Sequence, residues 1–363
     1  MTRWQRAAAL VAVLVVAGTA CGGANKPVTP KATESTAEGA ATALTGAGAT
    51  FPAPLYQKWA EEYLKKTGVK VNYQSIGSGG GIQQITAQTV DFGASDAPMK
   101  DEELAKAPGA IFHIPTVFGA VVVSYNIPSL RTPIKLTGQN VADIFLGKVT
   151  RWNDASIAGN NSGANLPSDD ITVVHRSDGS GTTDIFTGYL TSASPEWASK
   201  VGKGKEVAWP TGLGGKGNEG VTALVKQTPG SVGYIELAYA KQNSLPAASI
   251  KNKEGSFVAP DLRSITAAAA AAQPPDDLRF SLVNQPGAGS YPIAGATWLL
   301  VYKEQADQAK GKALVDFLWW AVHDAQKFAS ALLYAPVPKG LVEKTEAKIQ
   351  EITYQGRAIR KKV

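Results

Sequence analysis

The sequence contains very little cysteine and histidine. A single cysteine, Cys21, stands among 363 residues, so the chain cannot form an intramolecular disulfide bond or a cysteine-rich metal site. The three histidines, His113, His175 and His323, are far apart and lack the spacing of metal ligands or of a catalytic base. We therefore expect them to pack in the core or lie at the surface, and we expect no metal ion and no other cofactor.

Long hydrophobic runs are equally scarce. The run Ala7–Ala17 is shorter than the about 20 residues that a membrane-spanning helix needs, and nothing later in the sequence is long and apolar enough to replace it. It follows the positively charged start Met1–Arg6 and precedes the small residues Gly18–Ala20, which is the pattern of a secretory signal peptide. We therefore predict a signal peptide over residues 1–20 and an exported protein.

The segment around Cys21 resembles a bacterial lipoprotein signal, in which the cysteine becomes the acylated first residue, although Gly18 stands where that signal usually has leucine. The resemblance implies more than one acyl chain at Cys21, which stable membrane attachment requires. Residues 21–43 are mainly Gly, Ala, Thr, Pro, Ser and Lys and cannot bury a core. We predict a disordered tether that holds the folded body at the outer face of the cytoplasmic membrane.

The rest of the composition is that of a globular protein rich in turns. Hydrophobic residues make up 44% and charged residues 18%, with 37 glycines and 21 prolines, which favours an α/β architecture. The formal charge is +6, but no basic stretch is interleaved with aromatic residues as a nucleic-acid surface requires. We therefore predict no nucleic-acid partner, and we interpret the basic tail from Arg357 to Lys362 as a solvated helix end.

From Leu44 onward, short apolar runs alternate with amphipathic patterns. The apolar runs predict strands over residues 69–76, 112–125 and 171–175. The amphipathic patterns predict helices over residues 55–66, 82–89, 183–190, 221–227 and 310–333. Alternation of this kind predicts parallel sheets flanked by helices.

Three segments share one order: a strand, a loop of small residues, then a helix. They are residues 44–54, 76–81 and 176–182. Each could hold an anion, because a helix N-terminus exposes unpaired N–H groups and Gly, Ser and Thr let an oxyanion approach them. Each could equally be an ordinary helix cap with glycines for the turn. Three such segments, one beside Arg176, favour a tetrahedral oxyanion held from several sides.

Patterns typical of enzymes are missing. No Gly-Lys-Ser/Thr follows the glycines of these loops, and the stretch from Gly46 ends in Phe51 where a dinucleotide fingerprint requires Gly or Ala. Residues 212–217 fit G-x-G-x-x-G without a clear βαβ frame, so we interpret them as a loop that opens onto a helix. Ser180 is not in a G-x-S-x-G elbow. We therefore expect a binding protein with no catalytic residues.

Asp96 is the carboxylate that stands out. It lies in FGASDAP, just before a proline-led acidic stretch. Two interpretations remain open: Asp96 caps the following helix, or it contacts a ligand.

Six stretches together resemble the periplasmic phosphate-binding protein PstS family of ABC phosphate importers: LTGAGATFPAPLYQKWAEEY from Leu44, VNYQSIGSGGGIQQI from Val71, TVDFGASDAP from Thr89, DGSGTTDIFTGYL from Asp178, WPTGLGGKGNEGV from Trp209 and GSVGYIELAYAKQN from Gly230. The resemblance implies a two-lobed periplasmic-binding-protein fold of type II, with a hinge of crossing strands. The first lobe would comprise residues 44–122 and 296–363, and the second residues 123–295.

The resemblance also implies a set of phosphate ligands: Thr50, Phe51 through its backbone N–H, Ser78, Asp96, Arg176, Ser180, Gly181 and Thr182, with Asp178 orienting Arg176. Asp96 would accept the hydrogen that phosphate still carries near neutral pH. The implied function is high-affinity binding of hydrogen phosphate or dihydrogen phosphate and delivery to a membrane-embedded ABC permease, by a protein that we expect to be a monomer. The alternatives are a binder of another oxyanion such as sulfate or molybdate, a phosphoryl-transfer enzyme, and a structural surface lipoprotein.

Overall fold

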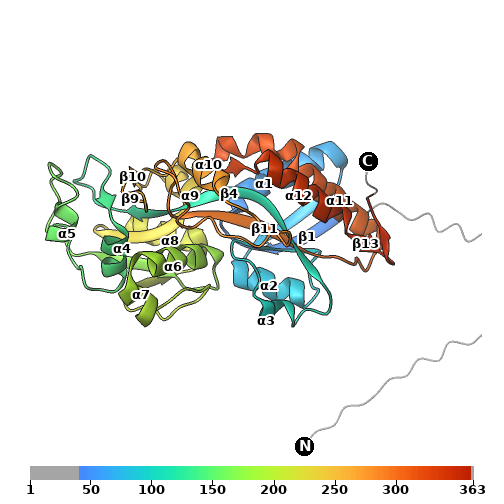
Figure 1. Cartoon of the computed structure of the whole chain (residues 1–363), viewed down its shortest axis with the longest axis horizontal. Helices are drawn as coiled ribbons and strands as arrows, with labels where there is room; N and C mark the ends of the chain where they lie inside the picture. The colour runs from blue at the N-terminus through green and yellow to red at the C-terminus, as the bar shows by residue number, and fades with distance from the viewer. Residues whose placement is uncertain (1–40, 361–363) are drawn as a thin grey trace, which may run out of the picture. The chain divides into compact units, whose positions relative to one another are not determined.

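Strands and helices alternate along the chain in the computed structural model, which describes residues 41–360 (Figure 1). The strands are β1 (Ala43–Gly48), β2 (Lys70–Ser75), β3 (Phe92–Ser95), β4 (Ile111–Tyr125), β5 (Lys135–Leu136), β6 (Thr172–Arg176), β7 (Leu213–Gly215), β8 (Ser231–Glu236), β9 (Ser249–Lys251), β10 (Phe257–Val258), β11 (Ala294–Tyr302), β12 (Ala335–Pro336), β13 (Thr353–Tyr354) and β14 (Arg357–Ala358). The predicted signal peptide, Cys21 and nearly all of the predicted tether lie outside the described residues.

The helices are α1 (Ala53–Thr67), α2 (Ser78–Thr86), α3 (Asp101–Leu104), α4 (Gly138–Phe145), α5 (Ala155–Ala158), α6 (Gly181–Ala193), α7 (Pro195–Lys200), α8 (Gly217–Gln227), α9 (Leu237–Gln242), α10 (Leu262–Ala270), α11 (Gln308–Val322) and α12 (Lys339–Gln350), with 3₁₀ helices η1 (Asp324–Phe328) and η2 (Ser330–Leu332). Within residues 41–360 we find no helix with the length and apolar character needed to cross a bilayer.

One sheet runs through the molecule in the order β2-β1-β3-β11-β4-β8-β6-β7, and β12 also pairs with β4. β1 is parallel to β2 and β3, and β6 is parallel to β7 and β8. The prediction of parallel strands is therefore confirmed at both ends of the sheet. The centre differs, because β11 and β4 join the two parallel groups through antiparallel pairs.

β4 belongs to both parts of the sheet. Its residues from Ile111 to Ala120 pair with β11, and those from Val121 to Tyr125 pair with β8. Its run of apolar residues is buried along almost its whole length, as expected for a strand covered on both faces. Figure 1 shows β4 passing between the part that carries β1 and α2 and the part that carries α6 and α8. We propose that the two lobes divide here, with boundaries near residues 122 and 296.

All five predicted helices are present with shifted bounds, and the shifts of α2 and α11 show the physical reasons most clearly. α2 begins at Ser78 rather than at residue 82, because the glycines of its first turn allow close packing: a Cβ at Gly81 would lie 2.6 Å from the Cα of Gly48. The helix predicted over residues 310–333 ends at Val322. His323 leaves helical geometry with φ −117° and ψ −95°, and the shorter 3₁₀ turns follow.

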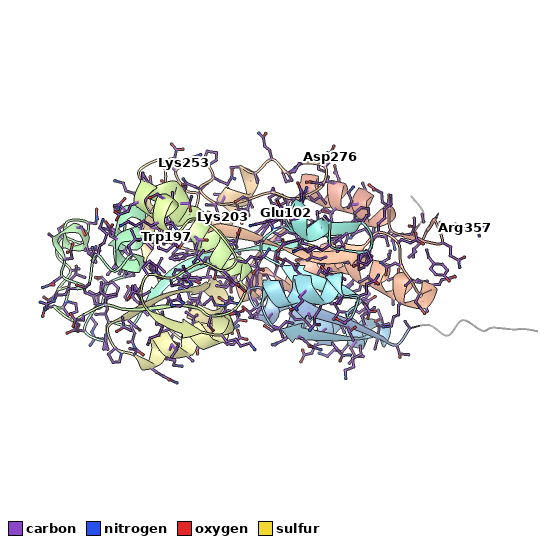
Figure 2. All side chains as sticks on the ribbon, turned by 90° about the horizontal axis from the view of Figure 1, so that it is seen from below. Glu102, Trp197, Lys203, Lys253, Asp276 and Arg357 are labelled. Atoms are coloured by element: carbon purple, nitrogen blue, oxygen red, sulfur yellow. The ribbon has the colours of Figure 1, made fainter. Side chains whose placement is uncertain are left out.

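The described part of the basic tail, residues 357–360, is not a helix end. Arg357 lies on β14, which forms a hairpin with β13, and it projects from the surface (Figure 2). Gln355 and Gly356 adopt positive φ angles of 49° and 71°, and two consecutive positive φ angles are the geometry of a tight hairpin turn. The prediction of a helix here was wrong, because this turn reverses the chain.

Candidate binding site

The three segments predicted to hold an anion converge on one buried place. Ser78, at the start of α2, accepts hydrogen bonds at its Oγ from the N–H of Gly181 at 3.0 Å and from the N–H of Asp96 at 3.2 Å. Gly181 opens α6, and Asp96 follows β3. The side chains of six predicted ligands are almost completely buried: Thr50, Ser78, Asp96, Arg176, Ser180 and Thr182. The structure thus brings the predicted residues together, and their contact with a ligand is our proposal.

The start of α6 offers backbone donors. Ser180 caps the helix, and its Oγ accepts the N–H of Thr183 at 3.0 Å. Gly181 and Thr182 follow as the first helical residues, whose N–H groups have no carbonyl partner within the helix. The Gly181 N–H already donates to Ser78 Oγ, so of these two predicted ligands Thr182 has the N–H that remains for an anion. Only glycine fits at position 181, since a Cβ there would lie 2.6 Å from both Asp96 Cβ and Ser78 Oγ.

Two tyrosines hold the loop after β1. The hydroxyl of Tyr239 donates to the carbonyl of Thr50 at 2.6 Å, and that of Tyr334 donates to the carbonyl of Phe51 at 2.7 Å. These bonds fix the peptide groups that present the predicted Phe51 N–H donor. The sequence analysis missed both tyrosines, because each lies more than a hundred residues from the loop it supports.

Arg176 and Asp178 form a buried ion pair. Arg176 Nε donates to Asp178 Oδ1 at 2.8 Å, Nη2 donates to Oδ2, and the arginine side chain is only 1% exposed. Burial favours the neutral acid, but the hydrogen bonds and the charge of Arg176 hold the pKa of Asp178 below its ordinary value. Nη1 remains free of the carboxylate and lies 3.4 Å from Thr182 Oγ1. The orienting role predicted for Asp178 fits this geometry.

Asp96 is not a helix cap. α3 begins at Asp101 with Lys100 before it, so the capping interpretation was wrong. Asp96 Oδ2 lies 3.5 Å from Ser78 Oγ, whereas Oδ1 is buried and has no hydrogen-bond partner among residues 41–360. Burial raises the pKa of Asp96 to about 7, and the Thr297 hydroxyl and the charge of Arg176 lower it only in part. The site therefore contains a buried carboxylate oxygen that can accept a hydrogen from a ligand.

This raised pKa predicts how the ligand-free protein responds to pH. A carboxyl group whose pKa rises from 3.8 to about 7 on folding stabilises the fold below about pH 4, and this stabilisation is lost as the pH rises toward 7. Asp96→Asn has no proton to lose. We expect the variant to have a free energy of unfolding a few kcal/mol (about 2–4) above that of wild type at about pH 8, and a much smaller difference at about pH 4. Chemical denaturation at both pH values measures this difference, and a gain that does not depend on pH would contradict it.

Asn218 is a site residue that the sequence analysis did not find. Its Nδ2 donates to Thr50 Oγ1 at 2.7 Å and to Thr182 Oγ1 at 3.1 Å. Residues 212–217 were interpreted as a loop that opens onto a helix. The helix is confirmed as α8, but most of the loop forms strand β7, and the βαβ frame that seemed absent is present. The overlooked signal was that this segment repeats the order of strand, small residues and helix seen in the three predicted anion-binding segments.

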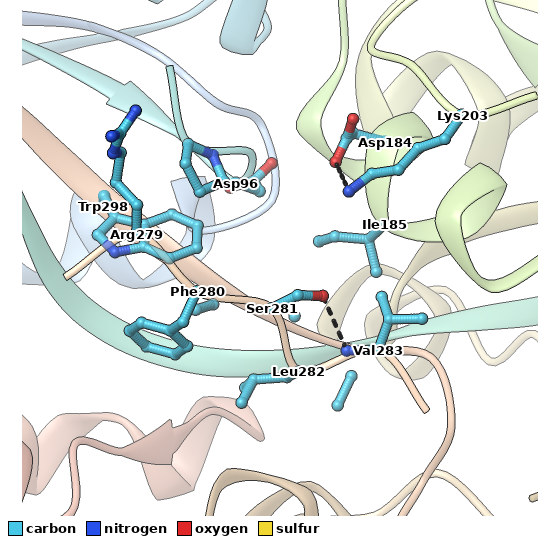
Figure 3. Close-up of a pocket in the computed structure, with 14 residues that line it drawn as sticks. Asp96, Asp184, Ile185, Lys203, Arg279, Phe280, Ser281, Leu282, Val283 and Trp298 are labelled. Carbon is cyan, nitrogen blue, oxygen red and sulfur yellow. Dashed lines mark hydrogen bonds and ion pairs between the residues drawn. The ribbon is translucent and has the colours of Figure 1, made fainter. Parts of the chain in front are cut away.

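A pocket of about 370 Å³ adjoins the buried carboxylate. Figure 3 shows Asp96 on one side and the Asp184–Lys203 ion pair, 3.2 Å between its charged atoms, on the other. Ala294 and Trp298 of β11 also line it. The pocket therefore lies between the segment after β3, which carries Asp96, and helix α6, which carries Asp184.

The histidines play structural parts, as predicted. His113 is buried and its Nε2 accepts the N–H of Met99 at 3.0 Å, while burial lowers its pKa to about 4. His175 stacks on Trp209, and His323 pairs with Glu346 at the surface. The described part of the chain contains no cluster of three or more metal-ligating side chains.

Comparison with known proteins places the chain in a family. Residues 33–324 match the model of the PBP superfamily domain. The phosphate-binding protein PstS of Pasteurella multocida is 50% identical over 311 residues, which cover 85% of this chain and 90% of that protein. PstS of Haemophilus influenzae is 46% identical over 317 residues, which cover 85% and 94%. The chain belongs to the PstS family.

Solved structures agree with the fold of the PstS family. A phosphate-binding protein from Stenotrophomonas maltophilia is 22% identical with a TM-score of 0.68, covering 85% of this chain and 94% of that one. A high-affinity periplasmic phosphate-binding protein solved with bound phosphate is 21% identical, also with a TM-score of 0.68, covering 84% and 93%. The fold of this PstS-family chain is therefore the two-lobed α/β fold that the sequence predicted.

Proposed function

We propose that the cleft binds inorganic phosphate, as hydrogen phosphate or dihydrogen phosphate, with high affinity and delivers it to a membrane-embedded ABC permease. The observation that carries the proposal is Asp96 Oδ1, a buried carboxylate oxygen without a hydrogen-bond partner among residues 41–360, at the place where the segments that carry Ser78 and Gly181 meet. Relatives named for phosphate binding support the same ligand.

The donors and the acceptor suit phosphate better than sulfate. Phosphate near neutral pH has oxygens for the donors and a hydrogen for Asp96. Sulfate has no hydrogen to offer, so it leaves the carboxylate unpaired at a cost of about 1–3 kcal/mol or more. The same argument opposes molybdate.

The charge of the site is small. The guanidinium of Arg176 is already paired with Asp178, so most of the ligand charge is met by dipoles from helix N-termini and hydroxyl groups. These rigid neutral donors favour binding by shape and hydrogen bonding. Relatives are named as binding proteins, which supports capture without chemistry, and we propose no catalytic residue and no cofactor.

We propose further that the protein is an exported monomer, anchored through acylated Cys21 at the outer face of the cytoplasmic membrane. The apolar run, the small residues before the cysteine and the tether composition support this location.

Contacts between the proposed lobes describe a closed cleft. The N–H of Gly79 in α2 donates to the carbonyl of Gly179 at 2.8 Å. Lys205 Nζ contacts both carboxylate oxygens of Glu103 at 2.6 Å and 2.8 Å, and both side chains are largely buried. The Lys205 carbonyl also accepts the N–H of Ser180 at 2.9 Å. The ion pair thus spans the cleft and is tied to a predicted ligand segment.

Removing this ion pair should speed phosphate release. We expect Lys205→Met to raise the dissociation rate about 3–30-fold with little change in the association rate, because the pair forms only when the lobes close. Stopped-flow fluorescence measures both rates. Lys148→Met is the control, since Lys148 pairs with Glu196 at 2.6 Å within one lobe. An unchanged dissociation rate in Lys205→Met would rule out this role.

Calorimetric titration of purified protein, with tryptophan fluorescence as a second signal, tests the proposed function. We expect tight binding of phosphate and weak or undetectable binding of sulfate. Equal affinity for the two anions would refute the role of Asp96 and favour a general oxyanion binder. Sustained hydrolysis of a phosphate ester that Arg176→Ala abolishes would favour an enzyme, and absence of any anion binding would favour a structural lipoprotein.

A further inference from the structure

Asn218 joins hydroxyl groups from both proposed lobes. Its Nδ2 donates to the oxygens of Thr50 and Thr182, and its backbone N–H donates to the same Thr50 oxygen at 3.1 Å. Thr50 follows β1 in the first lobe, whereas Asn218 and Thr182 lie in the first turns of α8 and α6 in the second. Asn218 is completely buried. One side chain therefore bridges the cleft at the level of the predicted ligands.

The orientation of the Asn218 amide is fixed by chemistry. Its Oδ1 accepts the backbone N–H of Glu236 at 2.9 Å. A backbone N–H can only donate, so the atom that faces it must be the amide oxygen. Nδ2 and its two hydrogens must then face the two threonines. If the amide were flipped, its NH₂ group would face the Glu236 N–H, and two donors would oppose each other.

A count of hydrogens shows what this does to the threonines. A hydroxyl has one hydrogen and two acceptor lone pairs. Thr50 Oγ1 accepts from the backbone N–H and from Nδ2 of Asn218, and Thr182 Oγ1 accepts from Asn218 Nδ2 and from Arg176 Nη1 at 3.4 Å. With both lone pairs filled, each hydroxyl can only donate its hydrogen elsewhere. The cleft is where an acceptor for these two hydrogens would lie.

We propose that Asn218 is a positioning residue that directs the hydroxyl hydrogens of Thr50 and Thr182 toward the bound anion. The inference rests on the proposed phosphate binding and adds a source of selectivity to it. Because Thr50 meets Asn218 only across the closed cleft, closure itself turns the Thr50 hydroxyl into a directed donor. A ligand that presents a hydrogen at either threonine meets a second hydrogen and is rejected.

Ser78 follows the same rule. Its Oγ accepts the N–H groups of Asp96 and Gly181, so its hydrogen can only be donated, either to the ligand or to Asp96 Oδ2, which lies 3.5 Å away. Hydroxyl acceptors are thus consumed within the protein at Thr50, Thr182 and Ser78. This pattern leaves the carboxylate of Asp96 as the acceptor for the ligand.

Asn218→Asp tests the proposal most sharply, because it keeps the shape and replaces a donor with an acceptor. The threonine hydrogens would turn toward the new carboxylate, whose charge would also repel the anion. We expect titration with inorganic phosphate to show a loss of at least about 100-fold in affinity. Affinity within about threefold of wild type would overturn the proposal.

Asn252→Asp is the matched control. Asn252 is also buried, and its Nδ2 donates to three carbonyl groups while its Oδ1 accepts two N–H groups, all in loops away from the site. It should lower the melting temperature and leave phosphate affinity within about twofold. Equal losses of affinity in both variants would show that Asn218 acts through general stability, and would overturn its positioning role.

A double-mutant cycle separates positioning from packing and covers the case in which the aspartate variant fails to fold. Asn218→Ala introduces no buried charge, and Thr50→Val removes the hydroxyl through which Asn218 is proposed to act. We expect the double variant to lose clearly less affinity than the product of the two single losses. A fully multiplicative loss would overturn the proposal.

A neutron crystal structure of the phosphate-loaded wild type gives a direct reading. We expect the deuterium atoms of Thr50 and Thr182 to lie between their oxygens and the ligand, and deuterium directed at Asn218 would overturn the proposal.

A wild type that fails to bind phosphate would refute the proposed function itself. A wild type that binds, together with an Asn218→Asp variant that binds equally well, would refute only the role of Asn218.

Discussion

Arg176→Ala should weaken phosphate binding by about 2–5 kcal/mol. The guanidinium supplies the one cationic side chain among the predicted ligands, and it is paired with Asp178 in a buried place. Removing it leaves the Asp178 carboxylate without its partner beside an anionic ligand, so both lost attraction and new repulsion oppose binding. Calorimetric titration near pH 7 measures the loss, and a thermal melt shows whether the fold persists.

Two further variants separate charge from geometry. Arg176→Lys keeps the charge, but a single ammonium group cannot reach both Asp178 oxygens and Thr182 together, so we expect it to recover only part of the affinity. Arg151→Ala removes an exposed arginine that lies 3.4 Å from Asp170 and should leave binding unchanged. If Arg176→Ala bound phosphate as wild type does, Arg176 would not be a ligand.

Asp96→Asn should bring the affinities for phosphate and sulfate closer together by about 10–100-fold. The amide can donate to a sulfate oxygen at any pH, whereas the ionised carboxylate can only repel it, and phosphate loses the acceptor for its hydrogen. Competitive titrations with both anions measure the ratio.

Asp184→Asn is the control for this change in selectivity. Asp184 is another aspartate that lines the same pocket, but its carboxylate is paired with Lys203. We expect it to discriminate between the two anions as wild type does. Unchanged selectivity in Asp96→Asn would refute the acceptor role of that side chain.

The fold was predictable wherever local pattern decides it. The apolar run over residues 112–125 predicted β4 to within one residue of its start, and each of the three small-residue segments does join a strand to a helix. Packing decided the rest. The start of α2 depends on the contact between Gly81 and Gly48, and the antiparallel centre of the sheet depends on how β11 returns beside β4. Such contacts between distant segments leave no periodic signal.

The residues of the candidate site also fall into those that local pattern predicts and those that only packing reveals. Its predicted residues follow local motifs, and the structure brings them together. Asn218, Tyr239 and Tyr334 act through hydrogen bonds to residues far away in the sequence, so nothing beside them in the sequence indicates their partners. Asp96 shows the reverse case, because its sequence context fitted a helix cap and only the position of α3 excluded that interpretation.

The shared strand β4 has a consequence for how the protein holds together. Neither sheet half can complete its hydrogen-bond ladder without a stretch of this one strand, so loss of order in one half deprives the other of a central strand. We therefore expect the two proposed lobes to melt as one cooperative unit. We also expect neither half to fold when it is expressed alone.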